Sequence, residues 1–136
     1  MDGVIKTRQA WIGKEEVVEV WFDPKRVSFD QLLAHGRTKE CARNVWWRHD
    51  AHAAAAKEAL GDQAAAAPKQ LRLDKEQKYY LLQTPLVALP LSEAQACRVN
   101  ASLEGEAFFR YLSPRQAKAA ATLFVAASKK RARESG

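Results

Sequence analysis

Residues 13–33, GKEEVVEVWFDPKRVSFDQLL, constrain the fold more than any other part of the chain. Residues Glu16–Phe22 are mostly β-branched or aromatic, and the two-residue period of a strand divides them between two faces, a pattern that predicts a β-strand. An Asp-Pro pair ends that strand, and Ser28 with Gln31 forms a capping box that predicts the start of a helix. A strand that gives way to a capped helix within so few residues predicts an α+β fold.

One charged residue interrupts the pattern of the predicted strand. Glu16 falls on its more apolar face, which also carries Val18, Val20 and Phe22. Desolvation disfavours the charged form of a carboxyl group, so a carboxyl group held against apolar side chains can donate a proton near neutral pH. The alternative is that Glu16 lies at the end of the strand and reaches water.

Further elements follow from the same kind of pattern. A connection containing Gly13 joins Val4–Trp11 to Glu16–Phe22, which predicts a β-hairpin. The NVWWR sequence is rich in residues that favour strands. After the hairpin, we expect a helix from Ser28 to Gly36 and a strand over Asn44–Arg48. An alanine-rich helix, capped by Asp50 and closed by Gly61, should follow. The first part of the chain then ends with a loop over Gln63–Pro68 and a short strand over Gln70–Leu73.

The rest of the chain is predicted to be helical. Capping boxes recur there, and each predicts the start of a helix: Asp74 with Gln77 before Tyr79 and Tyr80, Ser92 with Gln95, and Ser113 with Gln116 around Pro114. LSEAQ and LSPRQ resemble each other because they share this capping chemistry.

Composition narrows the class of protein. A chain of 136 residues with 47% hydrophobic and 28% charged residues is that of an ordinary globular protein. No apolar run is long enough to cross a membrane, and the first residues lack the apolar core of a signal peptide, so a cytoplasmic location is the default expectation. The net charge is +6, and the cations at the end of the chain, Lys129, Lys130, Arg131 and Arg133, are expected to lie on a solvated helix.

Histidine and cysteine residues offer candidate chemistry. His49 and His52 follow Cys41, but their spacing matches no zinc site, so no metal ligand and no cofactor are assigned. Cys41 is a candidate reactive thiol because cations surround it in the sequence, and the alternative is a buried structural cysteine. Cys41 and Cys97 are too few for a disulfide scaffold, although one bridge between them remains open.

Aromatic residues in the strand over Asn44–Arg48 are candidates for ligand binding. Trp46 and Trp47 point to opposite faces, so one is expected in the core and the other over a face or pocket.

These motifs resemble, in the correct order over residues 2–81, those of peptide-methionine (S)-S-oxide reductases, the A-type methionine sulfoxide reductases. GKEEVVEVWFDP is similar to the family's GHAEVVEVTYDP, DGVIKTRQAWIG to GVxxTxxGYAGG, ARNVWWRHDAH to YRSAIFYHDEEQ, and DKEQKYYL to EEYHQDYL. The resemblance implies an α+β sandwich with a ferredoxin-like core. It also implies that Glu16 donates a proton to the sulfoxide oxygen, that Trp46, Trp47, Tyr79 and Tyr80 contact substrate, and that a thioredoxin-type protein acts as reductant.

The chain departs from the family at the nucleophile. No residue carries the family's GCFWG motif, and the family's tyrosine in YRS falls on Ala42. Cys41, next to that position, is the candidate replacement nucleophile. Gly3–Thr7 also resembles a bacterial redox-associated group in which Val-Pro-Gly precedes cysteine or selenocysteine, but Val4 stands at the redox position.

The missing first strand of the family has a structural consequence. Without it, the strands Glu16–Phe22 and Asn44–Arg48 are expected to pair directly, in parallel, in one small mixed sheet covered by helices. Residues 1–81 are then the reductase-like core, and residues 82–136 a helical C-terminal extension with a basic tail.

Two functions of different classes are therefore expected from the sequence. The first is a degenerate or truncated methionine sulfoxide reductase-like protein that binds thioether or sulfoxide side chains of proteins without turnover, with Glu16 and Cys41 as remnants of the site. The second is a small basic interaction module whose C-terminal helix contacts an acidic partner or nucleic acid, with nucleic acid the less expected of the two.

Overall fold

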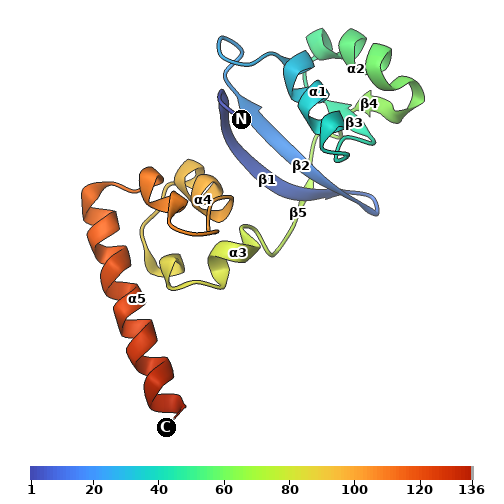
Figure 1. The fold of residues 1–136 in the computed structure, drawn as a ribbon. Helices are drawn as coiled ribbons and strands as arrows, with labels where there is room; N and C mark the ends of the chain where they lie inside the picture. Colours follow the sequence, from blue (N-terminus) through green and yellow to red (C-terminus); the bar gives the residue numbers. More distant parts are fainter. Residues whose placement is uncertain (136) are drawn as a thin grey trace. The chain divides into compact units, whose positions relative to one another are not determined.

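The computed structural model describes residues 1–135, and the chain divides into two compact units that meet between Leu73 and Asp74. The fold is α+β, and within the described residues every strand lies in the first unit, while the second contains helices and turns (Figure 1). The boundary expected from sequence lies eight residues later, after residue 81. The structure assigns residues 74–81 to the helical unit because Leu81 packs in its core.

A long hairpin forms the main sheet of the N-terminal unit, as predicted. Strands β1 (Val4–Ile12) and β2 (Glu15–Phe22) pair antiparallel through a turn of Gly13 and Lys14. Gly13 has φ of 60°, which suits the first position of a type II′ turn. The predicted strand near residue 72 is β5 (Arg72–Leu73), which pairs with the other side of β1, so the sheet order is β2-β1-β5 and β2 is an edge strand.

The two faces of this sheet differ in burial. Residues directly opposite each other in an antiparallel pair share a face, so the register fixes both sets. The covered face includes Ala10, which is fully buried, together with Lys6, Arg8, Ile12, Glu15, Val17, Glu19 and Trp21. The other face comprises Thr7, Gln9, Trp11, Glu16, Val18, Val20 and Arg72, and we call it the open face because its β2 residues and Arg72 are exposed, Val18 to 56%. Its β1 residues, Thr7, Gln9 and Trp11, are half-buried.

Helix α1 (Phe29–Thr38) begins where the sequence predicts. The hydroxyl of Ser28 accepts a hydrogen bond from the backbone N–H of Gln31 at 3.2 Å, and the side chain of Gln31 accepts one from the N–H of Ser28 at 2.9 Å. This capping box satisfies donors that the first turn of a helix leaves open. Leu33 is buried, and so is Val27, just before the helix.

The end of α1 lies two residues beyond the predicted end at Gly36. Glu40 adopts a left-handed conformation with φ of 56°. Its N–H bonds to the carbonyl of Arg37, and the N–H of Cys41 bonds to the carbonyl of Gly36, both at 3.0 Å. These are the hydrogen bonds of a Schellman motif, with glutamate at the position that glycine usually occupies.

A second, separate sheet contradicts two expectations. Strand β3 (Val45–Trp47) pairs in parallel with β4 (Ala64–Ala66), so the prediction of direct pairing with β2 is wrong. The prediction of a loop over Gln63–Pro68 is also wrong. Alanine has little intrinsic preference for strands. Residues 64–66 therefore form a strand because they bond to β3, and not because of their own sequence.

Helix α2 (Ala53–Leu60) connects the two strands of this second sheet. It closes at Gly61, as predicted, with φ of 54°. The predicted cap by Asp50 is wrong, because Asp50 opens a 3₁₀ turn over Asp50–His52 and neither start has a side-chain cap. Ala56 is fully buried, and Figure 1 shows α1 and α2 together beside the hairpin.

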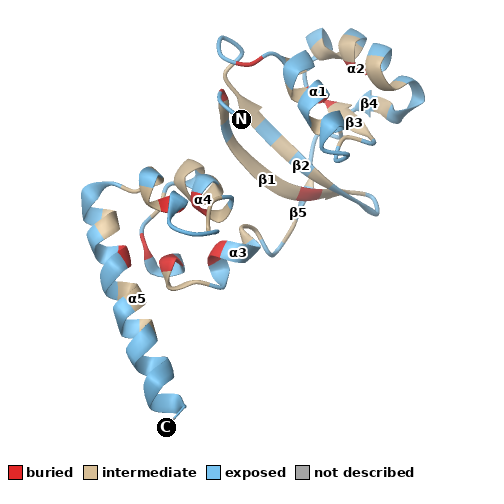
Figure 2. Ribbon diagram, viewed as in Figure 1, coloured by how far each residue is buried: buried red, intermediate tan, exposed pale blue. Residues whose placement is uncertain are grey.

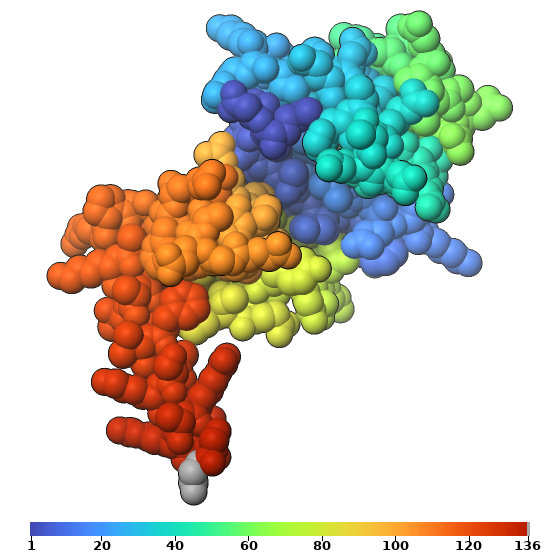
Figure 3. All heavy atoms as spheres, in the orientation of Figure 1, coloured from blue at the N-terminus to red at the C-terminus, as the bar shows by residue number. Residues whose placement is uncertain are grey.

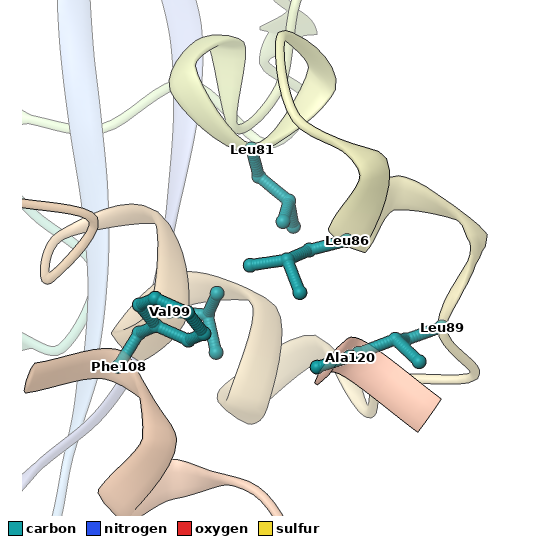
Figure 4. Close-up of a cluster of buried hydrophobic side chains, with 6 residues drawn as sticks. All are labelled: Leu81, Leu86, Leu89, Val99, Phe108 and Ala120. Atoms are coloured by element: carbon teal, nitrogen blue, oxygen red, sulfur yellow. The ribbon is translucent and has the colours of Figure 1, made fainter. Parts of the chain in front are cut away.

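The C-terminal unit consists of short helices, 3₁₀ turns and one long helix around an apolar cluster. Its elements are α3 (Tyr79–Leu82), a 3₁₀ turn over Pro85–Ala88, α4 (Glu93–Asn100), a 3₁₀ turn over Ala107–Tyr111 and α5 (Pro114–Glu134). The cluster consists of Leu81, Leu86, Leu89, Val99, Phe108 and Ala120, which converge from every one of these elements or their ends (Figure 4). Leu86 and Val99 are fully buried.

Two of the three predicted C-terminal capping boxes are confirmed, and hydrogen bonds link them. Ser92 with Gln95 caps α4, and Ser113 with Gln116 caps α5. The amide nitrogen of Gln95 donates to the side-chain oxygen of Gln116 at 2.9 Å and to the carbonyl of Tyr111 at 3.1 Å. The starts of the two helices are therefore held together directly.

The third predicted box, at Asp74 with Gln77, does not cap a helix. The carboxylate of Asp74 accepts from the N–H of Glu76 at 2.8 Å, which makes a local turn. Lys78, with φ of 57°, then precedes α3 in a left-handed conformation and provides no side-chain cap.

Only part of α5 packs against its unit. The residues that are not fully solvent-exposed recur on one side as far as Ala127, and every described residue after it is exposed (Figure 2). In Figure 3 the last turns of α5 stand clear of the other elements of the C-terminal unit. None of the helices within residues 1–135 is long and apolar enough to cross a membrane.

Candidate functional site

Glu16 lies on the open face of the main sheet and is exposed. Its neighbours along the strand, Val18 and Val20, are 56% and 39% exposed, so water reaches the carboxyl group. The alternation that places Glu16 with these valines was predicted correctly. The carboxyl group is not shielded from water as the pattern suggested, because the face that carries Glu16 and the valines is the open face.

Trp11 and Arg72 accompany Glu16 on the open face. Trp11 lies directly opposite Glu16 on β1, and Arg72 lies directly opposite Trp11 on β5. The guanidinium carbon of Arg72 is 5.2 Å from the centre of the Trp11 ring, a cation–π contact. A carboxylate, an indole and a guanidinium thus lie in a row across three strands, and we refer to Glu16, Trp11 and Arg72 as the cross-strand row.

The half-buried carboxylate of β2 is Glu19, which lies on the covered face. Its side chain is 13% exposed and bridges two guanidinium groups, with Oε2 at 2.8 Å from Nη2 of Arg8 and Oε1 at 2.8 Å from Nη2 of Arg48. Arg48 also donates to the carbonyls of Pro68 and Lys69, each at 3.3 Å. This cluster ties the hairpin to the ends of β3 and β4, which is a structural role.

Cys41 lies at the end of α1 and is exposed, not buried as a structural cysteine would be. Its thiol donates to the carbonyl of Gly36 at 3.3 Å, the same carbonyl that accepts its backbone N–H. A small hollow of about 320 Å³ lies next to it, lined by Arg37, Glu40, Ala42 and Arg43. Cys41 and Cys97 are not joined by a disulfide.

The structure does not bring Glu16 and Cys41 together on one face. The carboxylate of Glu15 accepts a hydrogen bond from Asn44 at 2.7 Å, so the segment that follows Cys41 approaches β2 from the covered side. Successive side chains of a strand point to opposite faces, and Glu16 therefore points away from that segment.

The tryptophans of β3 differ in burial as predicted. Trp47 is 9% exposed, and the ammonium group of Lys57 lies 5.4 Å from the centre of its ring. Trp46 is half-buried. Trp47 thus belongs to the core of the unit, and only Trp46 is available to contact a ligand.

Tyr79 and Tyr80 lie on α3, in the other compact unit from Glu16. They are 50% and 65% exposed, and their rings meet edge to face with centres 5.6 Å apart. Both are accessible to a partner, and neither belongs to the cross-strand row.

His52 packs among aromatic rings. It stacks on Phe29, with ring centres 4.4 Å apart and planes at 2°, and its centre lies 5.7 Å from that of His49. Within residues 1–135, no group of three or more His, Cys, Asp or Glu side chains is arranged to hold a metal ion.

Sequence reasoning missed Trp11 and Arg72. The signal for Trp11 was present, because a two-residue hairpin turn fixes the register and places Trp11 opposite Glu16. Arg72 could not be found in this way, since its pairing with β1 spans most of the N-terminal unit.

Comparison of the chain with family models, with curated proteins and with solved structures gives no match.

Proposed function

We propose that the N-terminal unit is a degenerate methionine sulfoxide reductase-like module that binds oxidised methionine side chains of proteins without reducing them. The observation that carries the proposal is the cross-strand row, in which an exposed carboxylate, an indole and a guanidinium share one open sheet face. The collinear sequence motifs over residues 2–81 supply the choice of ligand, although the last of them, residues 74–81, belongs to the C-terminal unit.

The chemistry of the row suits a sulfoxide. The methyl and methylene groups of the ligand can pack on the half-buried ring of Trp11 and on Val18. The sulfoxide oxygen is a hydrogen-bond acceptor, and the guanidinium of Arg72, which lies over the same ring, is a donor only.

Binding without turnover follows from the position of the thiol. Reduction of a sulfoxide by the reductase mechanism requires a nucleophilic thiol at the sulfur atom, while a carboxylic acid protonates the oxygen. Glu16 and the segment after Cys41 lie on opposite sides of β2. The proposal therefore gives Cys41 no nucleophilic role and requires no thioredoxin-type reductant.

Titration with blocked peptides tests the proposal. Three peptides that differ only in a central methionine sulfoxide, methionine or norleucine are added to the protein, and tryptophan fluorescence is recorded. We expect the sulfoxide to bind about tenfold more tightly than norleucine, the effect of one hydrogen bond to a charged group. Equal affinities for the three peptides would refute the proposal, as would loss of the sulfoxide during incubation with dithiothreitol.

Three variants assign the roles. Arg72→Gln removes the charged donor and should abolish the preference for sulfoxide. Arg37→Gln is the matched control, because Arg37 is an exposed arginine at the end of α1, outside the open face. Cys41→Ser should leave binding unchanged, and a loss of binding in that variant would instead favour a thiol-dependent site.

A second function is favoured by a separate feature of α5. Arg115, Lys118, Lys129 and Arg133 recur at helical spacing on the side opposite to the packed residues, and all four are exposed. This basic stripe supports binding to an acidic protein surface. The probe is polyglutamate, and the expected result is binding that weakens steeply with added salt.

Two double variants distinguish binding by the basic stripe from an effect of the net charge of the protein. Lys129→Glu with Arg133→Glu changes the stripe, whereas Lys130→Glu with Arg131→Glu makes the same change in charge off the stripe. If the stripe binds, the first double variant should lose far more affinity for polyglutamate than the second. Equal losses would show that net charge alone is responsible.

A further inference from the structure

The outer edge of β2 is built to pair with another strand. β2 is the edge strand of the order β2-β1-β5, and it is eight residues long. The two-residue turn makes Ile12 and Glu15 a hydrogen-bonded pair, so hydrogen-bonded pairs alternate from there along the hairpin. The backbone groups of Glu16, Val18 and Val20 consequently point away from β1, toward the free edge.

The same three residues carry the exposed side chains of the open face. All three side chains are exposed, and Val18, at 56%, is more exposed than Val20. Edge strands in natural proteins are commonly protected by an inward charge, a proline or a covering segment. Residues 15–22 contain no proline, and the inward charge of Glu19 is neutralised by Arg8 and Arg48. Two of the three outward residues, Val18 and Val20, are apolar.

Charge selects a peptide as the occupant in preference to a second copy of the chain. Only one symmetric antiparallel register pairs all three outward residues of two β2 strands with one another. It is centred on Val18 and would place each Glu16 against Val20 of the other copy, a carboxylate against an apolar side chain. A peptide can place a lysine or arginine opposite Glu16 and apolar residues opposite the two valines. That arrangement matches all three outward residues of the edge.

We propose that the oxidised peptide binds as an additional strand on the free edge of β2, with its backbone bonded to Glu16, Val18 and Val20. This inference rests on the proposed function for the identity of the side chain, and on the sheet geometry for the mode of binding. Peptide residues opposite these three positions share their face, so the sulfoxide side chain lies on the open face and extends toward Trp11. The recognised class is therefore an extended segment with a basic residue near an oxidised methionine.

A scan of peptide N-methylation tests the binding mode with the unmodified protein. The probe is a blocked peptide of alternating valine and threonine that contains one methionine sulfoxide and one lysine, and each backbone amide in turn is N-methylated. Strand addition predicts that affinity falls about tenfold at every second position and stays nearly unchanged at the positions between, since only alternate amides face β2. A scan without this alternation overturns the proposal.

A protein variant provides a second test. Val18→Pro removes an outward N–H without removing a bond to β1, so the hairpin can tolerate it, and Val18→Thr is the matched control that keeps the N–H. The proline variant should bind the probe about tenfold more weakly than the threonine variant, with folding checked by circular dichroism. If the proline variant does not fold, the N-methylation scan decides the question.

The outcomes distinguish the inference from the proposed function. If the effect of N-methylation alternates but oxidised and reduced peptides bind equally well, strand addition at the β2 edge is supported and recognition of the sulfoxide is refuted. If the protein prefers the sulfoxide peptide but the effect of N-methylation does not alternate, the proposed function is supported and strand addition at the β2 edge is overturned. A dimer of the protein alone in sedimentation, dissociated by Val18→Pro, would show that a second copy occupies the edge and would overturn the inference.

Discussion

Replacing Glu19 by glutamine should destabilise the N-terminal unit considerably more than the same change at Glu16. Glu19→Gln keeps the size of the side chain and removes the charge that bridges Arg8 and Arg48, each within 2.8 Å. Breaking a buried ion pair costs about 3–5 kcal/mol, and an exposed pair contributes about 0.2–1 kcal/mol.

The magnitude expected for Glu19 lies between those limits. The carboxylate is 13% exposed, but the side chains of Arg8 and Arg48 are 33% and 37% exposed, so water can solvate both guanidinium groups once the charge is lost. We therefore take about 1 kcal/mol for each pair, or about 2 kcal/mol in total. Glu16→Gln, at an exposed site with no such cluster, should change the free energy of unfolding by about 0.5 kcal/mol or less.

Urea denaturation followed by tryptophan fluorescence is the appropriate assay. All four tryptophans of the chain, at positions 11, 21, 46 and 47, lie in the N-terminal unit, so the signal reports that unit. With a slope of about 1 kcal/mol per molar urea, the midpoint should fall by about 2 M for Glu19→Gln. If the two variants have the same midpoint, Glu19 does not hold the hairpin to β3, and the structural role assigned to it is wrong.

Three further substitutions test the packing and the turns. Leu86→Ala, at a fully buried site, should cost about 2–5 kcal/mol, measured by circular dichroism of the helices during denaturation. Gly3→Ala should also be destabilising, because Gly3 has φ of 88° and an added Cβ would lie 2.5 Å from Cγ1 of Val27; an unchanged thermal midpoint would contradict this. Glu40→Gly should raise stability by up to about 1 kcal/mol, since Glu40 has φ of 56° in the Schellman motif, and a lower thermal midpoint would argue against the assigned geometry.

Local hydrogen-bond signals predicted local structure well. The turn at Gly13 and the capping boxes at Ser28, Ser92 and Ser113 involve residues at most three apart, and all of them occur in the structure. The box at Asp74 failed although its residues fit the same pattern. The competing turn at Asp74 and the left-handed Lys78 take the chain in another direction before a helix can start.

Features that depend on distant partners were not predictable. Ala64–Ala66 forms a strand only because β3 lies beside it, and nothing in three alanines indicates this. Alternation correctly divided β2 into two faces, but it could not say which face the rest of the unit covers. The half-buried carboxylate is consequently Glu19, whose environment depends on Arg48 from another part of the chain.

The hydrogen bonds between Gln95 and Gln116 have a mechanical consequence for α5. They fix the rotation of the helix about its own axis at its first turn, where it meets α4. A straight helix of 21 residues is about 31 Å long and nearly rigid in torsion, so that setting is transmitted to its last turn. Together with the packing of Ala120 in the core, two side-chain amides at one end of the helix thus determine the direction in which its distant cations face.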